Sequence, residues 1–158
     1  MIIKKNIYNF FFVIFIFLFD RITKYFIISS KNLNDNINYE ITSFLSFNLI
    51  WNEGIAFGLF SFEKKIYYNS LTILIILISL VIFWMIIKTK GLEKIGFMMV
   101  LGGSLGNVFD RIYYRQVPDF IDLHYNNFNW FIFNVADIFI SFGVILLIYL
   151  EIFFKKKR

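Results

Sequence analysis

The chain has 158 residues, a length that suits one domain, and 59% of them are hydrophobic, more than is usual in soluble domains. It has no cysteine, which excludes disulfides, thiol nucleophiles and Cys metal sites. The net charge of +5 is interpreted as membrane topology rather than nucleic-acid binding, because no basic patch is interleaved with aromatic residues.

The first predicted element is an uncleaved membrane-spanning helix over residues 7–28. A basic start before an apolar run also fits a signal peptide, but no small-residue cleavage site follows. Asp20 and Lys24 are four residues apart and share one face of this helix. Two interpretations are open. The pair caps the helix end while Arg21 and Lys24 snorkel towards water, or it faces the helix bundle and holds a site in place.

The next segment, residues 31–65, is a loop too long to be a plain connector. Within it Phe44–Asn52 alternates between two faces, which predicts a strand. Gly54–Phe60 is apolar and contains glycine. We interpret it either as a segment on the membrane surface or as a structured loop with buried aromatic residues.

Three further spans are predicted over residues 66–87, 92–110 and 131–154. Basic residues gather at the N-terminus, between the second and third spans, and at the C-terminus: Lys4, Lys5, Lys88, Lys90, Lys94, Lys155, Lys156, Lys157 and Arg158. The positive-inside rule then places both termini in the cytoplasm. As a consequence, the polar residues that end the spans all fall at the outer membrane face.

Gly102–Gly106 matches G-x-S-x-G, the pattern of a serine nucleophile. That pattern acts as a nucleophile on a strand-to-helix turn, whereas here it lies inside an apolar helix. Because Gly102 and Gly106 also form a GxxxG pair, we interpret the segment as close helix packing.

Two carboxylates stand out at the outer face. Asp119 is expected in a short polar loop, and Asp137 at the head of the last apolar run. Two adjacent carboxylates share one proton, so that one activates water while the other protonates the leaving amine. Such a pair is sufficient for amide hydrolysis without a metal or a covalent intermediate. The alternative is that Asp119 caps the loop and Asp137 caps the last helix.

Other chemistry has less support in the sequence. His124 is the single histidine, and no HExxH motif is present. No serine stands beside a lysine in a context that suits a Ser–Lys dyad. A non-enzymatic polytopic protein, either a small transporter or a scaffold, is the competing class, but transporters place polar residues at mid-membrane, often in paired repeats. The second span has almost none, and no repeat is visible.

Five sequence blocks, in order along almost the whole chain, resemble the lipoprotein signal peptidase (signal peptidase II) family. They are Asp20-x3-Lys24; Asn52-x-Gly54-x-Ala56-Phe57; Gly102-Gly103-x-Leu105-Gly106-Asn107-x2-Asp110-Arg111; Val117-x-Asp119-Phe120; and Phe133-Asn134-x-Ala136-Asp137. Two departures stand out. Arg115 occupies a position where the family often has glycine, and Ser104 one where alanine is usual.

The resemblance implies an aspartyl peptidase that cleaves prolipoproteins just before a cysteine that carries diacylglycerol. It implies catalytic roles for Asp119 and Asp137. It implies supporting or substrate-binding roles for Asp20, Lys24, Asn52, Gly54, Asn107, Asp110, Arg111, Asn134 and Ala136.

We therefore expect one domain over residues 1–158. Its fold is a membrane all-α fold of four transmembrane helices with a small extracytoplasmic β element and both termini cytoplasmic. The expected partners are membrane lipid and diacylglyceryl-prolipoprotein substrates, without nucleic acid, metal or cofactor. We expect a monomer in the cell inner membrane, with its active site at the extracytoplasmic face.

Overall fold

The structure is a computed structural model that describes residues 2–33, 39–54, 65–125 and 128–154. Within these residues the chain is mostly helical and has one small antiparallel sheet, as predicted. The elements in order are α1 (Ile2–Leu33), β1 (Tyr39–Thr42), β2 (Leu45–Asn52), α2 (Lys65–Lys88), α3 (Gly91–Tyr113), β3 (Val117–Tyr125), β4 (Phe128–Phe133) and α4 (Val135–Phe154).

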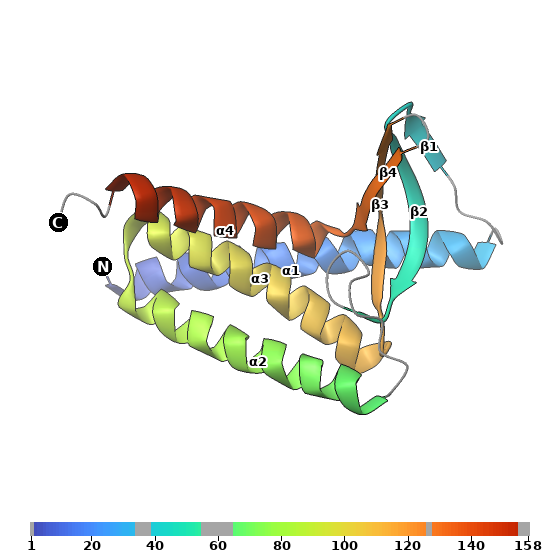
Figure 1. Cartoon of the computed structure of the whole chain (residues 1–158). Helices are drawn as coiled ribbons and strands as arrows, with labels where there is room; N and C mark the ends of the chain where they lie inside the picture. The colour runs from blue at the N-terminus through green and yellow to red at the C-terminus, as the bar shows by residue number, and fades with distance from the viewer. Residues whose placement is uncertain (1, 34–38, 55–64, 126–127, 155–158) are drawn as a thin grey trace.

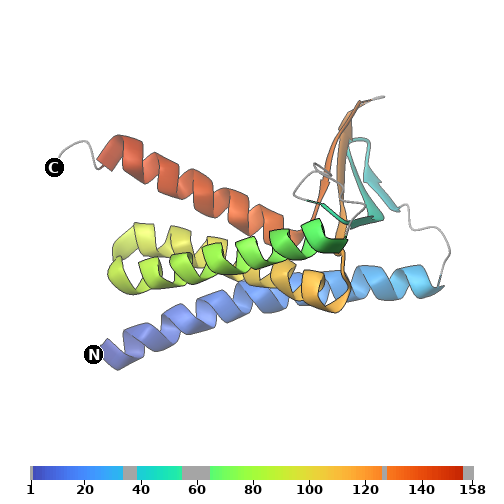
Figure 2. The same ribbon diagram turned by 60° about the horizontal axis from the view of Figure 1, so that its bottom comes forward.

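The helices lie side by side along one direction, and the sheet stands across one end of the bundle (Figures 1 and 2). The start of α1 and the end of α4 both lie at the opposite end of the bundle (Figure 1). Each pair of strands is a connection between two helices: β1 and β2 join α1 to α2, and β3 and β4 join α3 to α4.

Helix α3 is the centre of the bundle, because it packs against α1, α2 and α4. Its glycines allow this close approach on two faces. Gly102 and Gly106 face α1, and a Cβ atom on Gly102 would lie 2.8 Å from the Ile16 side chain. Gly103 faces α4, where a Cβ atom would lie 2.5 Å from the backbone oxygen of Ala136. The interpretation of this segment as close helix packing is therefore confirmed.

The sheet joins the two halves of the chain. Its strand order is β1-β2-β3-β4, and all neighbouring strands are antiparallel. In the central pair Ile50 is opposite Asp119, and in the next pair Ile121 is opposite Phe133. Leu49, Phe120 and Val135 form an apolar cluster that packs the sheet against the helices.

The predicted strand over Phe44–Asn52 is confirmed as β2, but the sequence interpretation missed β3 and β4. Asp119 lies within β3 and not in a loop. Because four consecutive residues from Val117 are buried, the alternation that identifies a half-exposed strand is absent there.

The helix predicted from Phe131 begins at Val135, because Phe131–Phe133 belong to β4. A continuous apolar run does not by itself distinguish a strand from a helix, and the boundary is set by the polar residue Asn134. Helix α1 is also longer than the predicted span over residues 7–28. Apart from Gly54, the predicted surface segment Gly54–Phe60 lies outside the described residues.

Two helical segments among the described residues, Tyr68–Lys88 and Val135–Phe154, are long and apolar enough to cross a membrane. The apolar sequences of α1 and α3 are interrupted by charged residues, chiefly Asp20, Arg21 and Lys24 in α1 and Asp110 and Arg111 in α3. Of these five residues, all but Arg21 are buried. The charges therefore face protein rather than the surroundings of the bundle.

We predict that Gly103→Ala destabilises the protein by about 1–3 kcal/mol, because the new Cβ atom would press on a backbone oxygen that has no room to withdraw. The measurement is the thermal unfolding midpoint in detergent. Leu105→Ala is the matched control, since Leu105 is on the same helix and is exposed. Equal midpoints for the two variants would contradict the tight α3–α4 contact.

Candidate active site

Asp137 is held at the start of α4 by a reciprocal cap. Its backbone N–H donates to Asn134 Oδ1 at 3.1 Å, and its Oδ2 accepts from the Asn134 backbone N–H at 3.2 Å. Asn134 is therefore the N-cap of α4, with Asp137 three residues later, the arrangement of a capping box. The other carboxylate oxygen, Oδ1, accepts from Asn107 Nδ2 of α3 at 2.8 Å.

Asp119 is held from both sides by amides. Its Oδ2 accepts from Asn52 Nδ2, at the end of β2, at 2.8 Å. Its Oδ1 accepts from Asn134 Nδ2 at 2.6 Å. The pairing of β2 with β3 brings Asn52 to this position, since Ile50 is opposite Asp119 in the sheet.

Asn134 therefore contacts both carboxylates at once. Its amide nitrogen donates to Asp119, while its amide oxygen and its backbone N–H hold Asp137. The residue is fully buried, so its amide has no water to replace these partners. One residue, through its side chain and its backbone N–H, thus links the two acids.

The electrostatics of the pair favour a retained proton. Burial raises the pKa of Asp119 to about 6, and the nearby charge of Asp137 adds to this rise. The hydrogen bonds from Asn52 and Asn134 and the charge of Lys24 act in the opposite direction. Asp119 is thus poised to change protonation close to neutral pH.

A second set of contacts fixes the chain beside the pair. The Asn52 Oδ1 atom accepts from the Gly54 backbone N–H at 2.8 Å, which turns the chain sharply after β2. Arg111 Nη2 then donates to the Gly54 carbonyl at 3.1 Å, and its Nη1 donates to the Asn107 carbonyl at 3.2 Å. Arg111 thus ties the end of β2 to α3.

The deepest part of the site is a buried ion cluster around Lys24. Its ammonium lies 2.6 Å from Asp110 Oδ2, 3.0 Å from Asp20 Oδ1 and 3.0 Å from Asn107 Oδ1. The side chains of Lys24, Asp20 and Asp110 are at most 1% exposed. Asp20 Oδ1 also accepts from the Ala136 backbone N–H at 3.0 Å, so the cluster holds the first turn of α4.

Both acids line a cavity of about 270 Å³. Its polar end is formed by Asn52, Asn107, Arg111, Asp119 and Asp137, and its walls include Ile75, Ile78, Ile82, Val100 and Ile140. An apolar chamber with two acids at one end suits an apolar ligand whose reacting bond reaches that end. No group of three His, Asp or Glu side chains in the described part of the chain is arranged to hold a metal ion.

The residues named from the sequence thus gather at one end of the bundle. Asp20 and Lys24 face the bundle, so the interpretation that they snorkel or merely cap the helix end is wrong. Arg21 does not snorkel either, because its guanidinium contacts Asp20 and Asp110. The sequence analysis named Arg21 only as a snorkelling residue and missed its place in the ion cluster. Its signal is a third charge directly beside Asp20 in an apolar helix.

We predict that Lys24→Met destabilises the protein by about 3–5 kcal/mol, because two buried carboxylates would lose the ammonium between them. Thermal unfolding and the yield of monodisperse protein in detergent measure this loss. Lys88→Met is the control, since Lys88 is exposed at the far end of α2. A Lys24→Met variant as stable as this control would show that the cluster does not carry the fold.

Comparison with known proteins connects this geometry to a family. Residues 12–153 match the family model described as signal peptidase (SPase) II. The lipoprotein signal peptidase of Pelagibacter ubique is 48% identical over 155 residues, which cover 98% of this chain and 93% of the relative. The lipoprotein signal peptidase of Francisella tularensis subsp. novicida is 36% identical over 160 residues, which cover 99% and 98%.

Solved structures agree with these sequence matches. A structure of a bacterial membrane enzyme superposes with a TM-score of 0.77 at 28% sequence identity, over 95% of this chain and 91% of the other. A second bacterial membrane enzyme structure has a TM-score of 0.74 at 27% identity, over 93% of each chain. The chain belongs to the signal peptidase II family.

Proposed function

We propose that this protein is an aspartyl endopeptidase that removes signal peptides from prolipoproteins, cleaving just before the diacylglyceryl-modified cysteine. Membership of the signal peptidase II family supports the reaction. The observation that carries the catalytic assignment is the bridging of Asp119 and Asp137 by Asn134 at the end of an apolar cavity.

In the proposed mechanism the two carboxylates share one proton. The ionised acid takes a proton from water as the water oxygen attacks the scissile carbonyl carbon. The protonated acid donates a hydrogen bond to the carbonyl oxygen, where negative charge develops. The tetrahedral intermediate then collapses, the C–N bond breaks, and the leaving nitrogen receives a proton from the pair.

The supporting residues act through position. Asn52, Asn107 and Asn134 donate amide hydrogens to the two acids and so fix their oxygens. The ion cluster of Lys24, Asp20 and Asp110 holds α1, α3 and the start of α4 together. Each acid is thus preorganised before substrate arrives, which spares the reaction the free energy of ordering it.

Lipid supplies much of the proposed substrate affinity. Ile75, Ile78 and Ile82 of α2 line the cavity together with Val100 and Ile140. These residues offer apolar walls to acyl chains or to the signal helix. Burial of each methylene group contributes about 0.8 kcal/mol. We therefore propose that a peptide without diacylglycerol is cleaved much more slowly.

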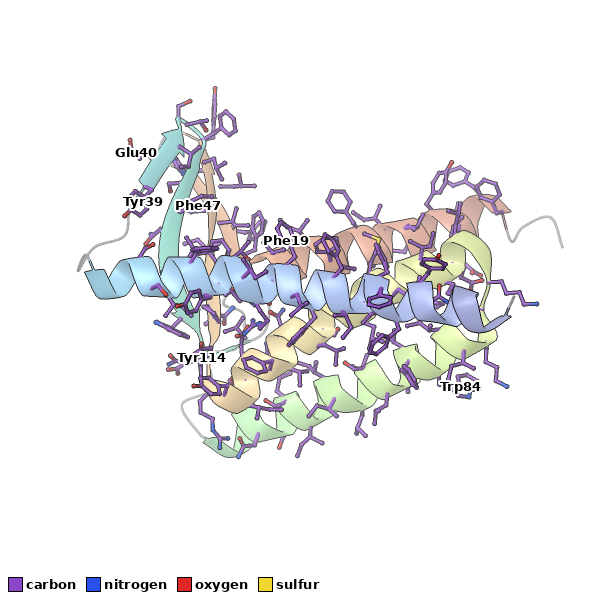
Figure 3. All side chains as sticks on the ribbon, turned by 180° about the vertical axis from the view of Figure 1, so that it is seen from behind. Phe19, Tyr39, Glu40, Phe47, Trp84 and Tyr114 are labelled. Atoms are coloured by element: carbon purple, nitrogen blue, oxygen red, sulfur yellow. The ribbon has the colours of Figure 1, made fainter. Side chains whose placement is uncertain are left out.

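The proposed topology has four spans, with both termini in the cytoplasm and the sheet outside. The ends of the helix bundle support it, because α1 begins and α4 ends at the end opposite the sheet (Figures 1 and 2). Trp84 also lies towards that opposite end, whereas Tyr114 lies near the sheet (Figure 3). Aromatic residues at both ends of a bundle are typical of the two membrane interfaces.

We predict that Asp119→Asn and Asp137→Asn each abolish most cleavage, and that the double variant is little worse than either. Each loses the shared proton while it keeps the shape of the side chain. The assay uses purified protein and a diacylated lipobox peptide, with the unmodified peptide as control. Substantial cleavage by either folded single variant, or equal turnover of both peptides by the native protein, would contradict the proposal.

The same pair predicts a bell-shaped pH profile of kcat/KM. Below both macroscopic pKa values the two acids are protonated and no base is present, and above both values no acid is present. Since the pKa of Asp119 is raised to about 6, one limb should have its midpoint near that pH. A value of kcat/KM that does not change as the pH passes through about 6 would contradict the shared-proton mechanism.

The topology is tested with single cysteines, since the native chain has none. Cysteine at Glu40, in β1, should react with an impermeant thiol reagent in intact cells. Cysteine at Lys90, between α2 and α3, should react only after the cells are opened. The reverse pattern would place the sheet and both acids in the cytoplasm.

A further inference from the structure

We propose that Arg21 is a positioning residue for the reaction. Its guanidinium neutralises the second carboxylate of the buried cluster, so that the Lys24 ammonium remains bound to Asn107 and through it to Asp137. This inference rests on the proposed roles of Asp119 and Asp137.

Arg21 forms a specific, hydrogen-bonded ion pair and is not a free surface charge. Its Nη1 donates to Asp110 Oδ1 at 2.5 Å, and its Nη2 donates to Asp110 Oδ2 at 2.8 Å. The same Nη2 lies 2.7 Å from Asp20 Oδ2. The pairing with Asp110 is bidentate, a geometry that a lysine does not reproduce. The guanidinium also lies 4.8 Å from the centre of the Phe109 ring, and its side chain is 15% exposed.

The balance of charge gives Arg21 its importance. Asp20 and Asp110 are two buried carboxylates, and Lys24 supplies a single positive charge. Arg21 supplies the second, so the four side chains together are neutral. Without it, one negative charge would remain uncompensated in an apolar bundle, which is costly.

The path from Arg21 to the acids is short and continuous. Asp110 Oδ2 accepts from both Arg21 Nη2 and Lys24 Nζ. Lys24 Nζ also donates to Asn107 Oδ1, and Asn107 Nδ2 donates to Asp137 Oδ1. Loss of Arg21 would leave Asp110 with the ammonium as its one charged partner in the cluster and draw the ammonium away from Asn107.

Several charged or titratable groups face this path from each packed element. Those near Arg21 are Asp20 and Lys24 of α1, Asp110 of α3, and Tyr114 directly after α3. Those near Asp137 are Asp20, Lys24, Arg111 and Asp119. Removal of a positive charge from this group makes ionisation of the acid pair less favourable, so the acidic limb of the activity profile should move to higher pH.

The test compares Arg21→Gln with Lys88→Gln. The second variant removes a positive charge from an exposed position at the C-terminal end of α2. With the diacylated peptide, Arg21→Gln should lower kcat about three- to thirtyfold, with little change in KM. Its acidic limb should lie at least about half a pH unit higher than in the native protein. Lys88→Gln should match the native protein in both respects.

A second variant separates charge balance from folding. Arg21→Gln/Asp110→Asn loses one charge of each sign, so the double variant should fold and return the acidic limb to its native position. A native kcat and pH profile in folded Arg21→Gln would overturn the inference. So would a double variant that does not restore the limb, or that folds no better than a misfolded Arg21→Gln. Absence of cleavage by the native protein would instead refute the proposed function.

Discussion

The structure depends on one buried ammonium, that of Lys24. It lies between Asp20 and Asp110 and joins α1 to α3 at the level where the sheet meets the helices. Charges inside an apolar bundle are tolerated only when they are paired, so this contact permits a single register of α1 against α3. The glycines of α3 allow the close approach that the ion pairs require, since Gly106 leaves room for the Asp20 carboxylate. Charge and small residues thus act together.

Beside this ion cluster, amide groups hold the two acids in position. Asn134 directly follows β4, caps α4 and contacts Asp119, so a single residue links the sheet, the helix and both carboxylates. Amides suit this task because they donate hydrogen bonds without adding charge. Burial and the repulsion from Asp137 therefore still raise the pKa of Asp119, while the geometry of the pair stays fixed.

Much of this could be predicted from the sequence, and the failures have physical reasons. The helices followed from apolar length, β2 from its alternation, and the polar cluster from the charges at the ends of apolar runs. Strand β3 was missed because its first four residues are buried without alternation. Strand β4 was missed because Phe131–Phe133 lie close to the apolar sequence of α4, so they were assigned to the helix. The bridging role of Asn134 depends on strand pairing between distant segments, which a single sequence does not reveal. The contact of Arg21 with Asp110 was not predicted, and snorkelling of Arg21 stayed one of two open interpretations, because the two residues are far apart in the chain.

The division of the sheet between two loops has a consequence for synthesis. Strand β2 comes from the first half of the chain and finds its partner β3 only after α2 and α3 have been made. Asn134 and Asp137 follow later still, and chains fold from the N-terminus as they emerge. A nascent chain therefore holds Asp119 without its neighbouring acid until Asp137, in the first turn of α4, has been made. The proposed acid pair is therefore one of the last parts of the site to form during synthesis.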